Sequence, residues 1–560
     1  MNTIKTGFLI LTAFLFTTTV KAQNLEDGKK LFFYEKYKSA KDFFSQMTNN
    51  VDATYWLGQT LLATEDITGA KTLYQQTLSA NPNSPLLIAG MGHIELLEGK
   101  TQDARQRFET AISLSQGKNA AVLNAIGFAN VDVKNGDADY AIDKLKQATA
   151  LKGMKDPDVY INLGDAYKKN VDGGLAQTAY ESALALNKNY ARASYKIGKI
   201  YQTQGASQED IFMKYYNEAI AKDPSFAPVY YNLYDYYYKI NVLKSGEYLE
   251  KYLTAKGDDE PNACYYRVSM KYAQGQFADA ISGADACIAA SASPYPNLYG
   301  LKAYAYSRLQ DSAKAKASFD EYFIHQKADK IGAGDYAAYA AVLLKFPGND
   351  SLAGTYTDKA VSLDSTEAGK VALLKGAAEY YESRKKFDVA AIWYNKILSV
   401  KKNLTKTDIY NAGYNSFRSG NYQSAISAFN TYSQKFPEDA FGYYMNGKAN
   451  WAIDSTMALG AANPFFEKAI AVGMADSVKY KNQIIGSCRY FVAYYANIKK
   501  DKASAIAYCD KILSIEPTDA EALANKTAIA NMNMSAPATK PATKPAAPKT
   551  TGAKTPPKKK

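Results

Sequence analysis

The residues best able to do chemistry in this chain are four cysteines, which fall into two pairs of nearly equal spacing. Cys264 and Cys287 lie 23 residues apart, and Cys488 and Cys509 lie 21 apart. Two antiparallel helices joined by a short turn bring residues at this separation level with each other, so each pair could form a disulfide in an oxidising compartment. Cysteine is also a common small buried residue, which leaves free thiols as the alternative. Neither pair has the CxxC spacing of a metal site.

Histidine, the commonest acid–base and metal-binding residue, occurs only twice, as His93 and His325, without an HExxH pattern. Residues 332–337 (GAGDYA) match a dinucleotide-binding fingerprint, but that motif needs a preceding strand and lies here between helical segments. We therefore expect no catalytic centre, no metal and no cofactor, and we interpret the chain as non-enzymatic.

A cluster of tyrosines favours recognition instead, because residues 230–238 contain six of them. Tyrosine offers a large rigid surface with one polar tip. On a helix these side chains cannot all face one side, so some must pack between helices. We expect Tyr231, Asp235 and Tyr238 to line a binding groove; the alternative is that tyrosine replaces phenylalanine in packing.

Internal repeats supply the elements that position these residues. Within each of two runs, a small residue recurs every 34 to 38 residues. The recurring positions are Gly58, Gly92, Gly127, Gly164 and Gly198, and then Ala303, Ala341, Ala378, Gly413 and Gly447. In several units an alanine follows twelve residues later and an aromatic residue four after that, as in Ala104 and Phe108. Such a period is typical of repeat architectures.

These residues resemble the tetratricopeptide repeat family, and residues 408–437 (DIYNAGYNSFRSGNYQSAISAFNTYSQKFP) are the best copy. The resemblance implies an all-α fold: an α-solenoid of about 13 stacked antiparallel helical hairpins with a concave groove. Because helices approach closely only where both present small side chains, we expect Gly92 to face Ala104.

The ends of the chain differ in composition from the repeats. Residues 1–22 have a lysine, an apolar run at 7–16 and a small-residue cleavage site, which predicts a signal peptide. The alternative, a membrane anchor, would need roughly 20 apolar residues. We interpret residues 23–50 as an N-terminal helical cap or degenerate repeat, and 51–300 and 301–532 as the two halves of the array.

Residues 533–560 consist mainly of proline, alanine, threonine and lysine, which predicts a disordered tail. The chain has a net charge of +12, and seven lysines of this tail carry most of it, so the repeats are nearly neutral. The tail could bind an anionic cell-wall polymer or lipid surface, or act as a solubilising spacer. Export would make nucleic acid an unexpected partner.

Residues 425–448 (AISAFNTYSQKFPEDAFGYYMNGK) look like repeats of periplasmic envelope-assembly and cell-division coordinator proteins. This resemblance implies a non-enzymatic protein-binding scaffold of the bacterial cell envelope, which captures protein partners on its concave face. We expect it in the periplasm or on the periplasmic face of the outer membrane. The alternative is a cell-wall or outer-membrane tether that binds through its basic tail.

Overall fold

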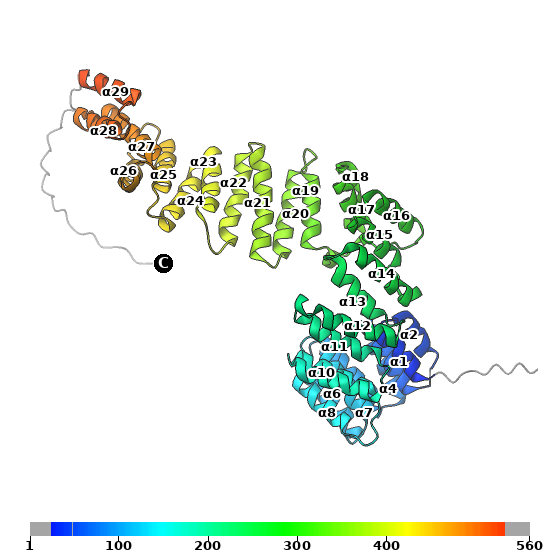
Figure 1. The fold of residues 1–560 in the computed structure, drawn as a ribbon. Helices are drawn as coiled ribbons and strands as arrows, with labels where there is room; N and C mark the ends of the chain where they lie inside the picture. Colours follow the sequence, from blue (N-terminus) through cyan, green and yellow to red (C-terminus); the bar gives the residue numbers. More distant parts are fainter. Residues whose placement is uncertain (1–23, 48, 533–560) are drawn as a thin grey trace, which may run out of the picture. The chain divides into compact units, whose positions relative to one another are not determined.

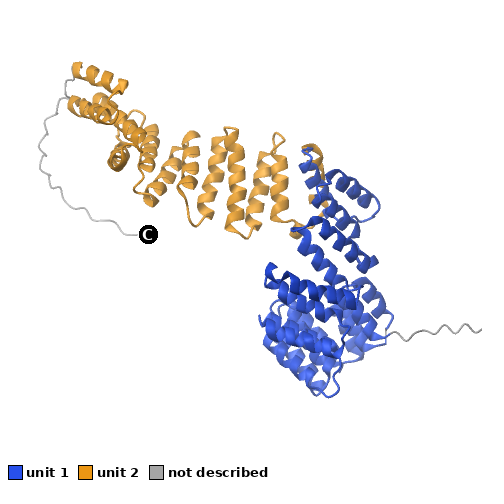
Figure 2. Cartoon of the chain, viewed as in Figure 1, with its two compact units in different colours: residues 1–311 blue, residues 312–560 orange. Residues whose placement is uncertain are grey.

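The computed structural model describes residues 24–47 and 49–532, and every regular element in these residues is a helix. The predicted signal peptide and tail therefore lie outside the described residues. The chain divides into two compact units, residues 1–311 and 312–560 (Figure 2). None of the described helices combines the length and the apolar character that a membrane span requires.

Unit 1 contains seventeen of the α-helices shown in Figure 1. They are α1 (Leu25–Phe33), α2 (Tyr37–Ser45), α3 (Val51–Ala63), α4 (Ile67–Ala80), α5 (Pro85–Leu97), α6 (Thr101–Leu114), α7 (Ala120–Asp132), α8 (Ala138–Thr149), α9 (Pro157–Lys169), α10 (Gly173–Leu186), α11 (Ala191–Thr203), α12 (Glu209–Lys222), α13 (Ala227–Tyr238), α14 (Val242–Lys256), α15 (Ala263–Ala273), α16 (Phe277–Ala289) and α17 (Asn297–Arg308). A short 3₁₀ helix, η2 (Gly257–Asp259), follows α14.

The described part of unit 2 contains twelve α-helices. They are α18 (Ser312–His325), α19 (Ala333–Leu343), α20 (Asp350–Leu363), α21 (Glu367–Ser383), α22 (Phe387–Val400), α23 (Lys406–Arg418), α24 (Tyr422–Lys435), α25 (Ala440–Ile453), α26 (Asn463–Gly473), α27 (Lys481–Ala493), α28 (Lys502–Ile515) and α29 (Ala520–Asn531). A π-helix, η5 (Tyr494–Lys499), continues α27. Taken in chain order, α3 to α28 make thirteen consecutive helix pairs, each with a first and a second helix.

Short turns join the two helices of each pair. The residues of these turns favour a left-handed backbone conformation and the start of a new helix. At Gly99, Gly275 and Gly420 the chain enters the left-handed region after the first helix, where glycine carries no steric penalty. The next helix often starts with an Asp or Asn whose side chain accepts a hydrogen bond from the backbone, as Asp66 and Asn421 do. Tight turns of this kind keep the paired helices antiparallel.

The recurring glycines make room for the aromatic residue of their own pair. A Cβ atom placed on Gly92 would lie 2.5 Å from the ring of Phe108 in the next helix, and one on Gly413 would lie 2.8 Å from the ring of Phe429. The nearest group to Gly92 is thus the ring of Phe108, four residues after the Ala104 that we expected Gly92 to face. The small residue allows a fully buried ring to lie against the first helix.

The first two helices, α1 and α2, form what we call the N-terminal hairpin, and it departs from the stacking of the repeats. Helix α2 packs on α3, at the start of the array, and also contacts η2, more than 200 residues later in the chain. In Figure 1 the blue helices α1 and α2 accordingly lie beside the first repeats and also beside green helices of unit 1. The hairpin thus packs on the first repeat, and it also reaches a later segment of unit 1.

Candidate binding pocket in unit 1

A buried lysine fixes helix α1 against the middle repeats. The ammonium of Lys29 lies 3.0 Å from carboxylate oxygens of Glu26 and Asp156 and 3.5 Å from one of Asp158. Burial alone would lower the pKa of Lys29, but the three carboxylates outweigh it and raise that pKa. The side chain is 7% exposed, so this charge depends on partners from the start of α9.

Further contacts join the hairpin to the later repeats of unit 1. The carboxylate of Asp223, after α12, accepts hydrogen bonds from Tyr34 and forms an ion pair with Lys30, each at 2.7 Å. Burial alone would raise the pKa of Asp223, but these partners and Ser225 outweigh burial and lower that pKa. Asp259 accepts from the amide of Ser39 at 2.8 Å. The N-terminal hairpin therefore contacts segments about 190 to 220 residues away.

Aromatic contacts also join the hairpin to the first helices of the repeats. The ring of Phe32 lies 5.2 Å from Trp56 and 6.3 Å from Phe128, measured between ring centroids. The guanidinium of Arg192 lies 3.8 Å from the centroid of Phe33. Edge-to-face ring pairs and cation–π contacts of this kind add to the energy of burial.

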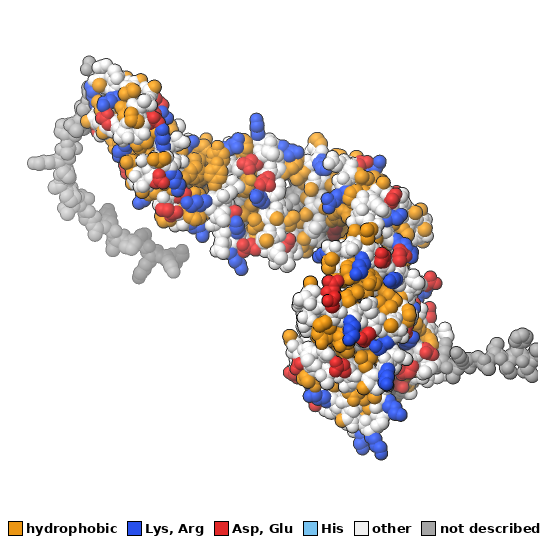
Figure 3. All heavy atoms as spheres, in the orientation of Figure 1, with side chains coloured by type: hydrophobic (Ala, Val, Ile, Leu, Met, Phe, Trp, Pro, Cys, Tyr) orange, Lys and Arg blue, Asp and Glu red, His pale blue; other side chains and the backbone are white. Residues whose placement is uncertain are grey.

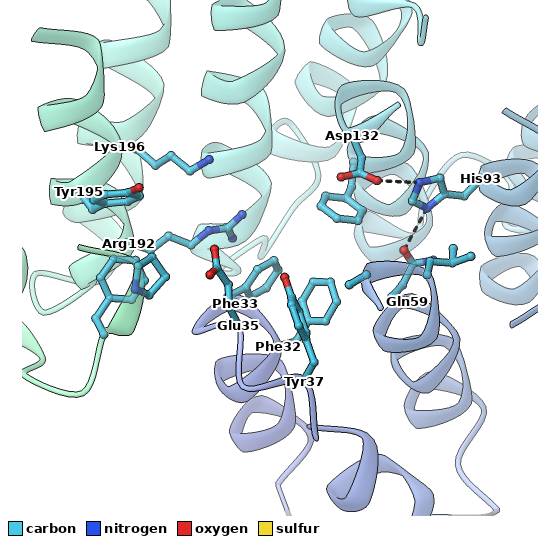
Figure 4. Close-up of a pocket in the computed structure, with 15 residues that line it drawn as sticks. Phe32, Phe33, Glu35, Tyr37, Gln59, His93, Asp132, Arg192, Tyr195 and Lys196 are labelled. Atoms are coloured by element: carbon cyan, nitrogen blue, oxygen red, sulfur yellow. Dashed lines mark hydrogen bonds and ion pairs between the residues drawn. The ribbon is translucent and has the colours of Figure 1, made fainter. Parts of the chain in front are cut away.

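A pocket of about 490 Å³ remains between the hairpin and the first helices of the repeats. The turn between α1 and α2 contributes Glu35, the start of α2 contributes Tyr37, and α11 contributes Tyr195, as Figure 4 shows. The opposite wall carries His93 from α5 and Asp132 from α7. We call the side on which these first helices face the hairpin the inner face of unit 1.

Hydrogen bonds hold one wall of the pocket rigidly. The Nδ1 of His93 lies 3.0 Å from Oε1 of Gln59, and its Nε2 lies 3.1 Å from Oδ2 of Asp132. The amide of Gln59 donates in turn to the hydroxyl of Tyr74 at 3.1 Å. The residues that line this pocket include no serine, threonine or cysteine beside this histidine and aspartate. The arrangement suits binding.

Charged groups on the other wall are paired and desolvated. Arg192 donates to Asp158 at 2.7 Å, and Lys196 donates to both oxygens of Asp165 at 2.9 and 2.8 Å. Burial lowers the pKa of Lys196, and the charge of Arg192 adds to that effect, although Asp165 opposes it. Burial also raises the pKa of Glu35. The pocket therefore places both signs of charge beside aromatic rings.

The tyrosines singled out in the sequence lie on α13 and do not line this pocket. Tyr231 and Tyr238 are 40% and 37% exposed, and Asp235 is also exposed. The ring of Tyr231 lies 5.2 Å from that of Tyr252 and 6.4 Å from that of Tyr266. These rings form a separate tyrosine cluster, in which Tyr252 is buried. The sequence did not predict Glu35, Asp132, Arg192 or Lys196 as site residues. Asp132, Arg192 and Lys196 are charged residues on first helices of the repeats, which is their one signal, and Glu35 has none.

The two cysteine pairs differ in the structure. Cys264 and Cys287 form a disulfide, with Cα atoms 6.0 Å apart. Cys264 lies nine residues before the end of α15, and Cys287 lies ten residues after the start of α16, so the two are level.

The predicted Cys488–Cys509 disulfide is absent, and both cysteines are free and buried. The π-helix η5 lengthens the first arm, so Cys488 lies eleven residues before its end, whereas Cys509 lies seven residues after the start of α28. An offset of about four residues amounts to roughly 6 Å along a helix. Burial raises the pKa of Cys488 to about 12.

Comparison with protein families assigns the repeats. Profiles described as tetratricopeptide repeat match residues 52–84, 161–225 and 296–323. The chain is a tetratricopeptide repeat protein. The three matched stretches coincide with α3–α4, α9–α12 and α17–α18 of this tetratricopeptide repeat protein. Proteins built from such repeats generally bind protein partners.

Solved structures of other repeat proteins are similar to parts of this one. The C-terminal part of a repeat-containing protein from Cytophaga hutchinsonii is 26% identical, covering 47% of this chain and 98% of that one, with a TM-score of 0.30. A tetratricopeptide repeat protein from Parabacteroides merdae is 18% identical, covering 46% and 98%, with a TM-score of 0.35. Yeast Tom70 is 13% identical, covering 71% and 95%, also at 0.35. No curated protein matches the chain.

Proposed function

We propose that this tetratricopeptide repeat protein is an exported, non-enzymatic scaffold of the bacterial cell envelope that captures a protein partner on the inner face of its repeats. The observation that supports this proposal is the pocket beside the N-terminal hairpin. Its lining combines aromatic rings with paired charges and is partly open to solvent. Packing of the hairpin against the repeats alone would need only apolar residues. Such a mixed lining is typical of specific binding sites.

The capture step is tested by affinity purification from envelope extracts with the full chain and two variants. Asp132→Ala removes a half-exposed carboxylate from the pocket wall, whereas Asp103→Ala removes an exposed one on the second helix α6. We expect a partner that the wild type and Asp103→Ala enrich equally and that Asp132→Ala loses at least fivefold. Equal enrichment by both variants would place the binding site elsewhere.

Export is tested separately by determining the N-terminus of the protein recovered from cells of the source bacterium. A mature chain that begins at Gln23, found in the periplasmic or outer-membrane fraction, supports the proposed location. Recovery of the chain with residues 1–22 intact in the cytoplasmic fraction contradicts it.

A tether that binds through residues 533–560 is the second candidate, because these residues carry seven lysines and no acidic residue. Attachment of that kind would weaken steeply as salt rises. Deleting residues 535–560 would abolish attachment to isolated cell wall if the tail is the anchor, and would leave it unchanged if the repeats are.

A further inference from the structure

The hydrogen-bond chain that ends at His93 fixes which of its ring nitrogens must carry hydrogen. It begins at the backbone carbonyl of Tyr55, which can only accept, and the hydroxyl of Tyr74 donates to that carbonyl at 2.6 Å. The hydroxyl has then used its one hydrogen, so in its 3.1 Å contact with Gln59 it must accept from the amide nitrogen Nε2. The other end of the Gln59 amide, Oε1, therefore faces His93, and Nδ1 of the ring must be the donor.

The second ring nitrogen of His93 also faces an acceptor. Its Nε2 lies 3.1 Å from Oδ2 of Asp132, and the dashed lines of Figure 4 mark both contacts of the ring. An ionised carboxylate has no hydrogen to give, so Nε2 must donate as well. A histidine that donates from both nitrogens is the cationic imidazolium. The network is therefore complete only while the ring of His93 carries a positive charge.

This ion pair is more enclosed than that of the other histidine of the chain. The side chain of His93 is 2% exposed and that of Asp132 is half-exposed, whereas His325 and Glu321 of α18 are both about half-exposed. Over the face drawn in Figure 3, acidic and basic side chains lie interspersed at the surface, where water screens such pairs. Because a buried polar group without its partner costs more than an exposed one, loss of a hydrogen should matter more at His93 than at His325.

Loss of the hydrogen on Nε2 would set a lone pair of His93 against the carboxylate of Asp132. The two groups would repel each other, and the half-exposed carboxylate is the one with room to move. A second cation lies near it, because burial lowers the pKa of Lys169 and the charge of Asp132 partly opposes that effect. Asp132 can therefore turn from His93 toward Lys169 and leave the pocket wall.

Other ionisable groups face this network from α1 to α4, α9 and α11. They are Glu35, Tyr37, Tyr55, Tyr74, Lys169, Arg192, Tyr195 and Lys196. Burial raises the pKa of each of these tyrosines, so they stay neutral over the pH range of histidine. Arg192 and Lys196 are paired with aspartates. Burial also raises the pKa of Glu35, so this carboxyl is the group that an experiment must separate from His93.

We propose that His93 is a positioning residue, which holds Asp132 in the pocket wall while both of its ring nitrogens carry hydrogen and releases it as pH rises through the range of about 5 to 8 in which histidine titrates. Capture on the inner face should accordingly be strongest at the lower end of this range. The proposal rests on the proposed function, because it describes the regulation of the same pocket.

Nitrogen NMR of the full chain labelled with ¹⁵N-histidine tests the proton pattern without any partner. The chain has only two histidines, and the variant His325→Gln assigns their signals. At about pH 5 both ring nitrogens of His93 should carry hydrogen. At about pH 9 the remaining hydrogen should be on Nδ1, because Gln59 still accepts it, whereas His325 should keep it on Nε2, which faces Glu321. Hydrogen on Nε2 of His93 at the higher pH would overturn the proposal.

Affinity purification from envelope extracts, repeated between about pH 5 and 9, tests the release of Asp132. Wild type and His325→Gln should retain at least threefold less partner at the upper end than at the lower end. His93→Gln, whose side chain does not titrate, should lose this dependence, and Glu35→Gln should keep it. A dependence that persists in His93→Gln, or that Glu35→Gln abolishes, would overturn the proposal. If His93→Gln unfolds unit 1, the nitrogen measurement on the wild type still decides.

The outcomes separate this proposal from the proposed function. Capture that depends on Asp132 but not on pH would remove the role of His93 and leave the scaffold function standing. Failure of capture at every pH would contradict the scaffold function and, with it, the release step.

Discussion

The same repeat forms two different kinds of unit in this chain. In unit 1 the first helices surround the N-terminal hairpin, and hydrogen bonds such as that of Tyr34 with Asp223 span 189 residues. In unit 2 the corresponding bonds reach one repeat along the chain, as between Lys396 and Asp358, 38 residues apart. The difference shows that a segment outside the repeats decides whether an inner face becomes a pocket.

The largest expected effect comes from removing the buried charge that fixes the hairpin. Lys29→Met leaves Asp158 and Asp156 without a partner that they share in the folded state, so unit 1 should lose about 3 kcal/mol or more of its free energy of unfolding. In unit 2, Lys386→Met removes a half-exposed ion pair with Asp350 and should cost less than about 1 kcal/mol.

Hydrogen exchange followed by mass spectrometry measures the protection of the backbone amides in each unit separately, so it can test both variants. A loss of protection confined to residues 25–45 in Lys29→Met, with the repeats unchanged, would show that the hairpin is not needed for the stability of unit 1. A loss in unit 2 as large as that in unit 1 would remove the contrast between them.

A reductant should also affect the stability of the two units differently, and the loss in unit 1 should be slightly smaller than that caused by Lys29→Met. Breaking the Cys264–Cys287 bond releases a loop of 23 residues and should lower the free energy of unfolding of unit 1 by roughly 3 kcal/mol. Unit 2 has only free cysteines among its described residues and should not respond. Denaturation without reductant should expose Cys488 and Cys509 to alkylation; labelling of all four cysteines would exclude the disulfide.

Acid should loosen the hairpin through Asp223. Because the folded-state pKa of this carboxyl is lowered, its stabilising contribution is complete above the unfolded value of about 3.9 and is lost as pH falls through the folded value. Asp223→Asn should mimic acid at neutral pH and cost about 2 kcal/mol, because hydrogen bonds to a charged group are lost.

The matched variant for the acid experiment is Asp408→Asn in unit 2, whose carboxylate bonds to Lys401 only seven residues away. It should speed amide exchange in its own turn alone, whereas Asp223→Asn should speed exchange in residues 25–45, after correction for the intrinsic effect of pH. Exchange in 25–45 that does not respond to Asp223→Asn would show that this contact does not hold the hairpin.

The repeats could be predicted from the sequence because their signal is local and recurs. Glycines such as Gly92 and Gly413 lie at a fixed distance from a buried ring, and the period shows in the printed sequence. The contacts that hold the N-terminal hairpin show no recurring pattern of this kind in the sequence. Asp156 is the N-cap of α9, where an aspartate is expected whether or not a lysine from elsewhere reaches it, and Asp223 lies in the turn after α12, where an aspartate is common for local reasons.

The cysteines show the limit of spacing arguments in a similar way. Separations of 23 and 21 residues are almost the same, but a π-helix of six residues shifts one partner along its helix. A π-helix has no clear sequence signature, so the offset of Cys488 from Cys509 could not be foreseen. The exposure of Tyr231 and Tyr238 followed from helical geometry, whereas their distance from the pocket depends on the path of the hairpin.

The position of the hairpin also constrains the order in which unit 1 can mature. Its docking partners extend to Asp259, so the segment made first must wait until more than 200 further residues exist. At a synthesis rate of about 5–20 residues per second this wait lasts roughly 10 to 40 seconds. During that time the bonds of Tyr34 with Asp223 and of Ser39 with Asp259 cannot form, so the docking of the hairpin is completed late in the folding of unit 1.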